Sequence, residues 1–254
     1  MDNKKSFFTY ISDNKIIHII LSIILAFVVG AIFLVVMGLD VGVTYQRLLT
    51  SITGIKGFSY VIVYSIPYIM TGLSVAFSFK TGVFNIGAEG QFVVGSMSAA
   101  VVGILFGSLP KGVLIPLCFI AAMLAGMLWG LIVAFLKTKW GINEVLSMIM
   151  FNWIAFYISN FIAGIPAIHS DGTAEATKNI SENASTLLSK AFIKDAGLCP
   201  TANWGILVVI VFTIAVWLVI DKTTLGYRLK AVGYNRFSAE YAGINVNRSI
   251  LTAI

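Results

Sequence analysis

Six apolar runs in this chain are each long enough to cross a lipid bilayer as a helix. A helix needs about 20 apolar residues to span the hydrocarbon core. The whole chain is 58% hydrophobic and only 11% charged, which excludes an ordinary water-soluble domain. We therefore expect an all-α fold, a polytopic transmembrane helical bundle with about six spans that forms a single membrane domain over residues 1–254. The runs lie at residues 16–38, 58–79, 83–106, 113–136, 142–162 and 204–220.

The basic residues predict the orientation of this bundle. Lys and Arg are enriched in cytoplasmic loops, and most of the 17 basic residues fall on one side when the N-terminus is placed in the cytoplasm. Residues 164–203 then form an external loop, with one short amphipathic helix expected near residues 184–192, and residues 221–248 form a cytoplasmic loop. The inner set is Lys4, Lys5, Lys15, Lys80, Lys137, Lys139, Lys222, Arg228, Lys230, Arg236 and Arg248.

The excess of positive charge fits a membrane surface better than a nucleic acid. The net charge is +6, but the basic residues are dispersed between apolar runs and form no continuous patch. We expect contact with membrane lipid and no nucleic-acid partner. The last apolar stretch, residues 249–254, is too short to span a membrane, so we expect the chain to be a C-terminally truncated part of a longer protein.

The third apolar run contains polar residues that a membrane helix rarely carries. Residues 83–95 read VFNIGAEGQFVVG, and a carboxylate at the centre of a span costs about 3 kcal/mol unless it faces protein or water. On one continuous helix Asn85, Glu89, Phe92 and Ser96 share a face, and Gln91 lies in the same segment. We predict that Asn85, Glu89, Gln91 and Ser96 line a pathway for substrate. The alternative is that these groups only hydrogen-bond neighbouring helices.

A second polar group opens the fifth run, which reads GINEVLSMIMFN from Gly141. Asn152 lies within this span and joins the predicted pathway residues. Glu144 lies near the inner end, where its carboxylate can reach the membrane interface instead. Two pairs of glycines spaced by four, Gly103 with Gly107 and Gly126 with Gly130, predict close packing between helices.

No pattern of an enzyme is present. The sequence contains neither the GxxxxGK[ST] phosphate loop nor the HExxH zinc motif, and His18 and His169 are isolated. Cys118 lies in an apolar run and Cys199 in a polar loop, so neither a disulfide framework nor a metal site is expected. We predict no catalytic residue and no metal site.

Three segments in this order resemble the permease subunits of bacterial ABC importers: FNIGAEGQFVVG, GINEVLSMIMFNWIA and TTLGYRLKAVGYNRFSAEYAGI. The resemblance is to the branch of ribose, branched-chain amino acid and nucleoside permeases, and NIGAEGQ most resembles the purine nucleoside and simple sugar subgroup. It implies three protein partners: an ATP-binding cassette ATPase that carries ATP and Mg, a second permease subunit, identical or different, and an extracellular substrate-binding lipoprotein. It also implies a bacterial plasma membrane location, no cofactor on this chain, and several further helices.

By this resemblance residues 221–248 dock on the ATPase. Leu225, Leu229, Val232 and Phe237 are spaced to bury against a partner groove as short amphipathic helices. The alternative is a basic loop that serves only membrane topology. The predicted docking residues are Leu225, Gly226, Arg228, Lys230, Ala231, Gly233, Asn235, Ala239, Gly243 and Ile244.

The sequence thus predicts the permease subunit of an ATP-driven importer for nucleosides, with simple sugars as the next candidate. The alternative from another class is a gradient-driven secondary transporter or a channel, in which Glu89 is a proton or cation site. A membrane scaffold or a non-functional fragment is a third possibility.

Overall fold

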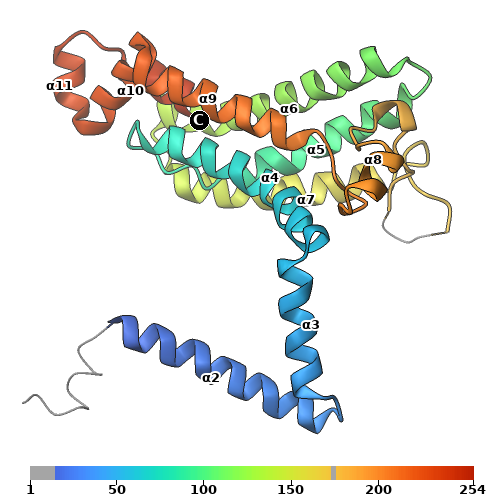
Figure 1. The fold of residues 1–254 in the computed structure, drawn as a ribbon. Coiled ribbons are helices and arrows are strands. Elements are labelled where there is room, and N and C mark those ends of the chain that lie inside the picture. Colours follow the sequence, from blue (N-terminus) through green and yellow to red (C-terminus); the bar gives the residue numbers. More distant parts are fainter. Residues whose placement is uncertain (1–14, 173–175) are drawn as a thin grey trace, which may run out of the picture. The chain divides into compact units, whose positions relative to one another are not determined.

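The computed structural model describes residues 15–172 and 176–254, and over these residues the fold is built from helices (Figure 1). Six of them are long and apolar enough to cross a membrane, which confirms the predicted all-helical bundle with six spans. Lys4 and Lys5, used above for orientation, lie outside the described residues. The six helices are α2 (Lys15–Val36), α4 (Ile55–Phe79), α5 (Ala88–Leu105), α6 (Lys111–Trp140), α7 (Glu144–Ala163) and α9 (Gly205–Lys222).

The chain divides into two compact units, Met1–Phe58 and Ser59–Ile254. In the first unit, α2 is followed by α3 (Val41–Thr53), which has 13 residues and is too short to span a membrane. Asp40 caps α3 by accepting a hydrogen bond from the Val43 amide at 2.8 Å. The Tyr45 hydroxyl donates to the carbonyl of Phe27, and this bond joins α3 to α2.

Glycines allow α5 and α6 to pack closely at the centre of the second unit. A Cβ added at Gly95 would lie 3.1 Å from the Ala122 carbonyl oxygen, and one at Gly126 would lie 3.3 Å from the Gln91 carbonyl oxygen. The expected close helix packing is thus present at Gly126. Gly103 and Gly107 instead contact residues 164–203, the predicted external loop, where the Ser181 hydroxyl donates to the Gly107 carbonyl at 3.0 Å.

The external loop also contacts the start of the second unit. The amide of Cys199 donates to the Ser59 hydroxyl at 2.7 Å. The loop contains a 3₁₀ turn, η1 (Glu182–Ala184), and a short helix, α8 (Lys190–Asp195). The short helix expected near residues 184–192 therefore begins later than predicted, because Ser189 provides the side-chain cap that starts α8.

The opposite end of this unit contains the turns between α4 and α5 and between α6 and α7. It also contains three short helices: α10 (Thr224–Tyr234), α11 (Arg236–Tyr241) and α12 (Val246–Ala253). The Arg236 guanidinium donates to the Gly82 carbonyl between α4 and α5, and the Ser78 hydroxyl donates to the Ala253 carbonyl. This end carries the basic residues Lys80, Lys137, Lys139, Lys222, Arg228, Lys230, Arg236 and Arg248.

The third span differs from its prediction. The apolar run begins at residue 83, but α5 begins at Ala88, with Gly87 as its N-cap residue. Gly82 has a left-handed φ of 71°, which a residue with a Cβ adopts only with strain. Val83 and Asn85 are fully buried in the irregular segment that follows. Residues 80–87 therefore form a partly buried turn, and the prediction that Asn85 lies on the helix is wrong.

Candidate functional site

Asn152 of α7 fixes the start of α5. The Gly90 amide donates to the Asn152 Oδ1 atom at 3.0 Å, and the Asn152 Nδ2 atom donates to the Ile86 carbonyl at 3.1 Å. The first amides of a helix have no partner within the helix, so Asn152 acts as a cap supplied by another helix. A Cβ at Gly90 would lie 2.7 Å from Asn152 Oδ1, which explains the glycine.

Asn85 and Gln91 form a second polar cluster beside this cap. The Asn85 Nδ2 atom lies 3.3 Å from the Ser74 hydroxyl and 3.4 Å from Gln91 Oε1. Gln91 in turn donates to the Ile254 carbonyl at 3.1 Å. Asn85 Oδ1 and Trp129 Nε1 have no partner among the described residues. Both residues line a cavity of about 10 Å³, which has room for about one water molecule.

Three of the predicted pathway residues, Asn85, Gln91 and Asn152, therefore gather around the start of α5 and bind protein groups. Glu89 and Ser96 lie elsewhere, on an exposed face of α5 that also carries Phe92. This face keeps the spacing of three and four residues that the sequence indicated. We call Glu89, Phe92 and Ser96 the polar stripe.

Glu89 lies in the first turn of α5, where the helix dipole stabilises a carboxylate. It is nonetheless exposed on this chain and belongs to a helix that is long and apolar enough to cross a membrane. A charged side chain in such a helix faces protein or water, because contact with lipid is costly. The polar stripe is therefore the candidate for a side of α5 that faces protein or water.

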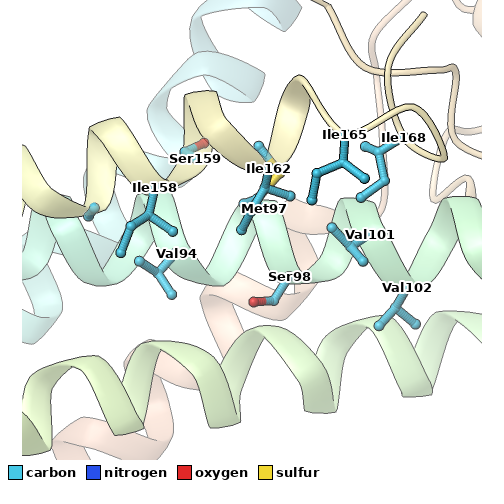
Figure 2. A pocket seen from close by; sticks show the side chains of 11 residues that line it. Val94, Met97, Ser98, Val101, Val102, Ile158, Ser159, Ile162, Ile165 and Ile168 are labelled. Carbon is cyan, nitrogen blue, oxygen red and sulfur yellow. The ribbon is translucent and has the colours of Figure 1, made fainter.

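A larger cavity of about 450 Å³ lies between α5 and α7 (Figure 2). Its lining is apolar except for Ser98 and Ser159, and it contains none of the five predicted pathway residues. A polar solute would find few hydrogen-bonding partners there. We therefore place the candidate site at the polar stripe.

The face of α10 that was expected to meet a partner packs against its own chain instead. Leu229 and Val232 are 2% and 1% exposed. A Cβ at Gly226 would lie 2.2 Å from the Ile220 carbonyl oxygen of α9, so α10 approaches α9 at backbone distance. The expectation that Leu229 and Val232 bury against a partner is therefore wrong. Leu225 and Phe237 are exposed.

Some of the remaining predicted docking residues stabilise the local fold, and others are exposed at the surface. Asn235 caps α11 by accepting from the Ser238 amide at 3.1 Å, and Gly243, with φ 80°, makes the turn between α11 and α12. Lys230 pairs with Asp221 at 2.5 Å. Ala239 is buried, like Gly226, and Ala231 and Ile244 are half-buried. Arg228 and Gly233 are exposed.

Four aromatic side chains cover the outer face of α10 and α11. Tyr227, Tyr234, Phe237 and Tyr241 are 71%, 89%, 85% and 98% exposed. We call these four residues the aromatic surface. Only Phe237 was singled out from the sequence. The available signal was the density of aromatic residues in a short, polar and basic loop, where a solvated connector needs none.

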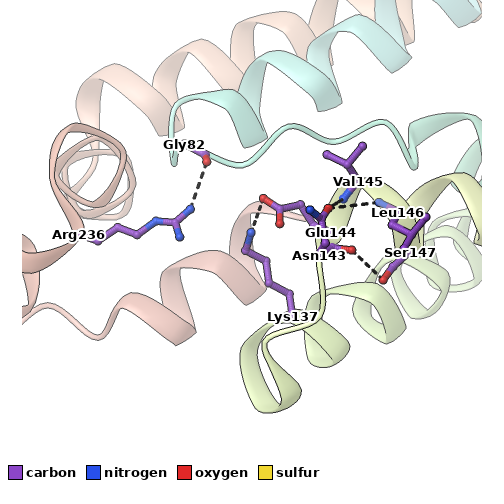
Figure 3. Close-up of polar contacts among 8 residues, drawn as sticks. All are labelled: Gly82, Lys137, Asn143, Glu144, Val145, Leu146, Ser147 and Arg236. Atoms are coloured by element: carbon purple, nitrogen blue, oxygen red, sulfur yellow. Dashed lines mark hydrogen bonds and ion pairs between the residues drawn. The ribbon is translucent and has the colours of Figure 1, made fainter.

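Charged and polar groups join this end of the bundle to the membrane helices (Figure 3). Arg236 donates to the Gly82 carbonyl at 3.3 Å. Lys137, in the last turn of α6, forms an ion pair with Glu144, the first residue of α7. Asn143 caps α7 by accepting from the Val145 amide at 2.9 Å. The charge of Glu144 is thus paired at the start of α7.

Six membrane-spanning helices, with a basic and aromatic pair of short helices at one end, define a polytopic membrane protein. Residues 57–254 match the family described as permease component of branched-chain amino acid transport systems, and the chain belongs to this family.

Several similar curated proteins are permeases of ABC transporters. The guanosine permease protein NupP of Bacillus subtilis is 37% identical over 240 residues, which is 92% of this chain and 66% of NupP. The nucleoside permease protein NupB of Lactococcus lactis is 32% identical over 250 residues, 95% of this chain and 67% of NupB. The glucose permease protein TsgB13 of Haloferax volcanii is 32% identical over 234 residues, 89% of this chain and 60% of TsgB13.

The chain thus spans 60% to 67% of the length of these relatives. No solved structure matches it significantly.

The capping role of Asn152 predicts that replacing its side chain lowers the stability of the protein. In Asn152→Ala the Gly90 amide and the Ile86 carbonyl lose their partner, and each unpaired buried group costs about 1–3 kcal/mol. We expect a clearly lower thermal unfolding temperature in detergent. Asn160→Ala, which changes an exposed asparagine of the same helix, should leave the temperature nearly unchanged. Equal temperatures for the two variants would contradict the capping role.

Proposed function

We propose that this chain is the membrane-spanning subunit of an ATP-driven importer that carries nucleosides, or related simple sugars, across the bacterial plasma membrane. The observation that carries this proposal is the similarity to two nucleoside permeases over more than nine-tenths of the chain. The similarity to a glucose permease supports simple sugars as the second substrate class. ATP and Mg would bind to a separate ATPase subunit.

The orientation follows from the same proposal. The end of the bundle that carries α10 and α11 also carries most of the described basic residues, and such residues are enriched on the cytoplasmic side. This supports a cytoplasmic N-terminus and an ATPase at that end. The external loop would then lie on the opposite side of the membrane from the ATPase, where it would face a substrate-binding lipoprotein.

A second permease subunit would cover the polar stripe. Both NupP and NupQ, two guanosine permease proteins of Bacillus subtilis, are similar to this chain. Two related permeases that bring their α5 helices together would enclose Glu89 and Ser96 in a water-filled pathway. Their carboxylate and hydroxyl groups are suited to hydrogen-bond the hydroxyls of a ribose or hexose. Phe92 offers an aromatic face beside them.

The aromatic surface would dock on the ATPase. Exposed tyrosines and phenylalanines are costly to leave in water, and buried aromatic residues commonly carry much of the binding energy of an interface. Arg228 lies exposed on the same helix as Tyr227 and Tyr234 and would meet acidic groups on the partner. The inner face of α10, built from Gly226, Leu229 and Val232, would hold this surface in place.

The energy source and substrate can be measured together. The complete transport complex in proteoliposomes loaded with ATP and Mg should take up labelled guanosine, and a protonophore should leave this uptake unchanged. Unlabelled nucleosides should compete more strongly than glucose, and leucine should not compete. Uptake that does not depend on ATP and is abolished by the protonophore would overturn the proposal in favour of a gradient-driven transporter.

Glu89 should be needed for transport. Glu89→Gln removes the charge from the polar stripe and should lower guanosine uptake at least about tenfold, because a hydrogen bond to a charged group is worth about 1.5–3 kcal/mol. The amount of assembled complex should stay the same. Glu182→Gln, an equal change in the external loop, serves as the control. Unchanged uptake by Glu89→Gln would remove this residue from the pathway.

The aromatic surface should determine affinity for the ATPase. The double variant Phe237→Ala and Tyr241→Ala should weaken binding of the purified ATPase to the permease in lipid nanodiscs at least about tenfold, since each interface anchor is worth about 2 kcal/mol or more. The control is Tyr157→Ala with Phe161→Ala, two exposed aromatics of α7. Equal binding by both double variants would place the docking surface elsewhere.

A further inference from the structure

Arg236 joins α11 to the turn between α4 and α5. Its guanidinium donates to the Gly82 carbonyl at 3.3 Å (Figure 3). Gly82 adopts φ 71°, so the direction of this carbonyl depends on a conformation that favours glycine. Asn235 caps α11, and Arg236 is the first residue of this helix, so the cap fixes the position of the arginine backbone. The bond therefore connects two backbone segments whose local geometry is set independently.

A second contact joins the same two segments. A Cβ at Gly233 would lie 2.1 Å from the Lys80 carbonyl oxygen, and the backbone of α10 is therefore in contact with the turn. This steric contact resists movement of α10 toward the turn. The hydrogen bond from Arg236 resists movement of α11 away from it. The two contacts together transmit displacement in both directions.

The turn leads directly to the polar stripe. Val83 and Asn85 are fully buried, and the bonds of Asn152 to Ile86 and Gly90 hold the following residues against α7. Glu89 lies between these two bonded residues. A displacement of the turn near Gly82 therefore reaches the residue that begins the polar stripe through a partly buried segment that is hydrogen-bonded to α7.

The charge of Arg236 also has a partner across the α6–α7 turn. Glu144 is paired with Lys137 and lies near enough to Arg236 for an electrostatic interaction. Glu144 thus receives positive charge from two elements, α6 and α11. Loss of Arg236 would leave the Lys137 pair intact, so the α6–α7 turn keeps its own connection.

We propose that Arg236 is a positioning residue that couples movement of the α10–α11 docking helices to the turn before α5, and through it to Glu89. This inference rests on the proposed function, because it assumes that an ATPase moves these helices. Arg236 itself contacts neither substrate nor nucleotide in this account. Its removal should therefore separate ATP hydrolysis from transport.

The test compares transport with ATP hydrolysis in proteoliposomes that contain the complete complex. In Arg236→Gln we expect substrate-stimulated ATP hydrolysis to stay within about twofold of the unaltered complex, while guanosine uptake falls about tenfold, a typical size for coupling between sites. The ratio of ATP hydrolysed to guanosine transported should rise accordingly. Arg236→Lys keeps a charged donor and should restore at least about half of the uptake.

The matched control is Arg248→Gln, which removes an equal charge from an exposed arginine on α12. This variant should keep the ratio of the unaltered complex. An equal loss of hydrolysis and uptake in Arg236→Gln would show a structural role in assembly and overturn the inference. Normal hydrolysis with normal uptake would overturn it as well. Absence of ATP-dependent uptake in the unaltered complex would instead refute the proposed function itself.

Discussion

The structure depends on which groups hydrogen-bond the backbone amides and carbonyls where α5 begins. Within a membrane protein, backbone groups that leave helical geometry need partners from the protein itself. Residues 80–87 form such an irregular segment, and Asn152 supplies an acceptor for Gly90 and a donor for Ile86 at its end. This single amide side chain decides where the third span starts.

The spans were predictable because their length and apolar character are local properties of the sequence. The start of α5 was not, since an apolar run continues through the turn and its composition does not change at Ala88. Gly82 and Gly87 were visible signals of a break, but periodicity alone does not tell which glycine ends a helix. As a result Glu89, Phe92 and Ser96 kept their predicted face, whereas Asn85 left it.

The roles of the amide residues depend on contacts far apart in the sequence. Asn152 was recognised as a polar residue within a span, but its partners are more than sixty residues earlier. The same difficulty affected α10, which has apolar residues on more than one face. Gly226 allows backbone contact with α9, and this contact turns Leu229 and Val232 inward. A sequence pattern identifies an amphipathic helix but does not say whether its apolar face meets its own chain or another.

The inward packing of α10 has a consequence for the movement of α5. A docking surface transmits force only if the helix beneath it cannot rotate freely, and Leu229 and Val232 lock α10 against its own bundle. The aromatic residues on the opposite face then move with the backbone that touches Lys80. Because Asn152 ties the start of α5 to α7, the proposed push at Lys80 would displace both helices together. In the proposed coupling the polar stripe would then move with the backbone of α5, and not through a change in the side chain of Glu89 alone.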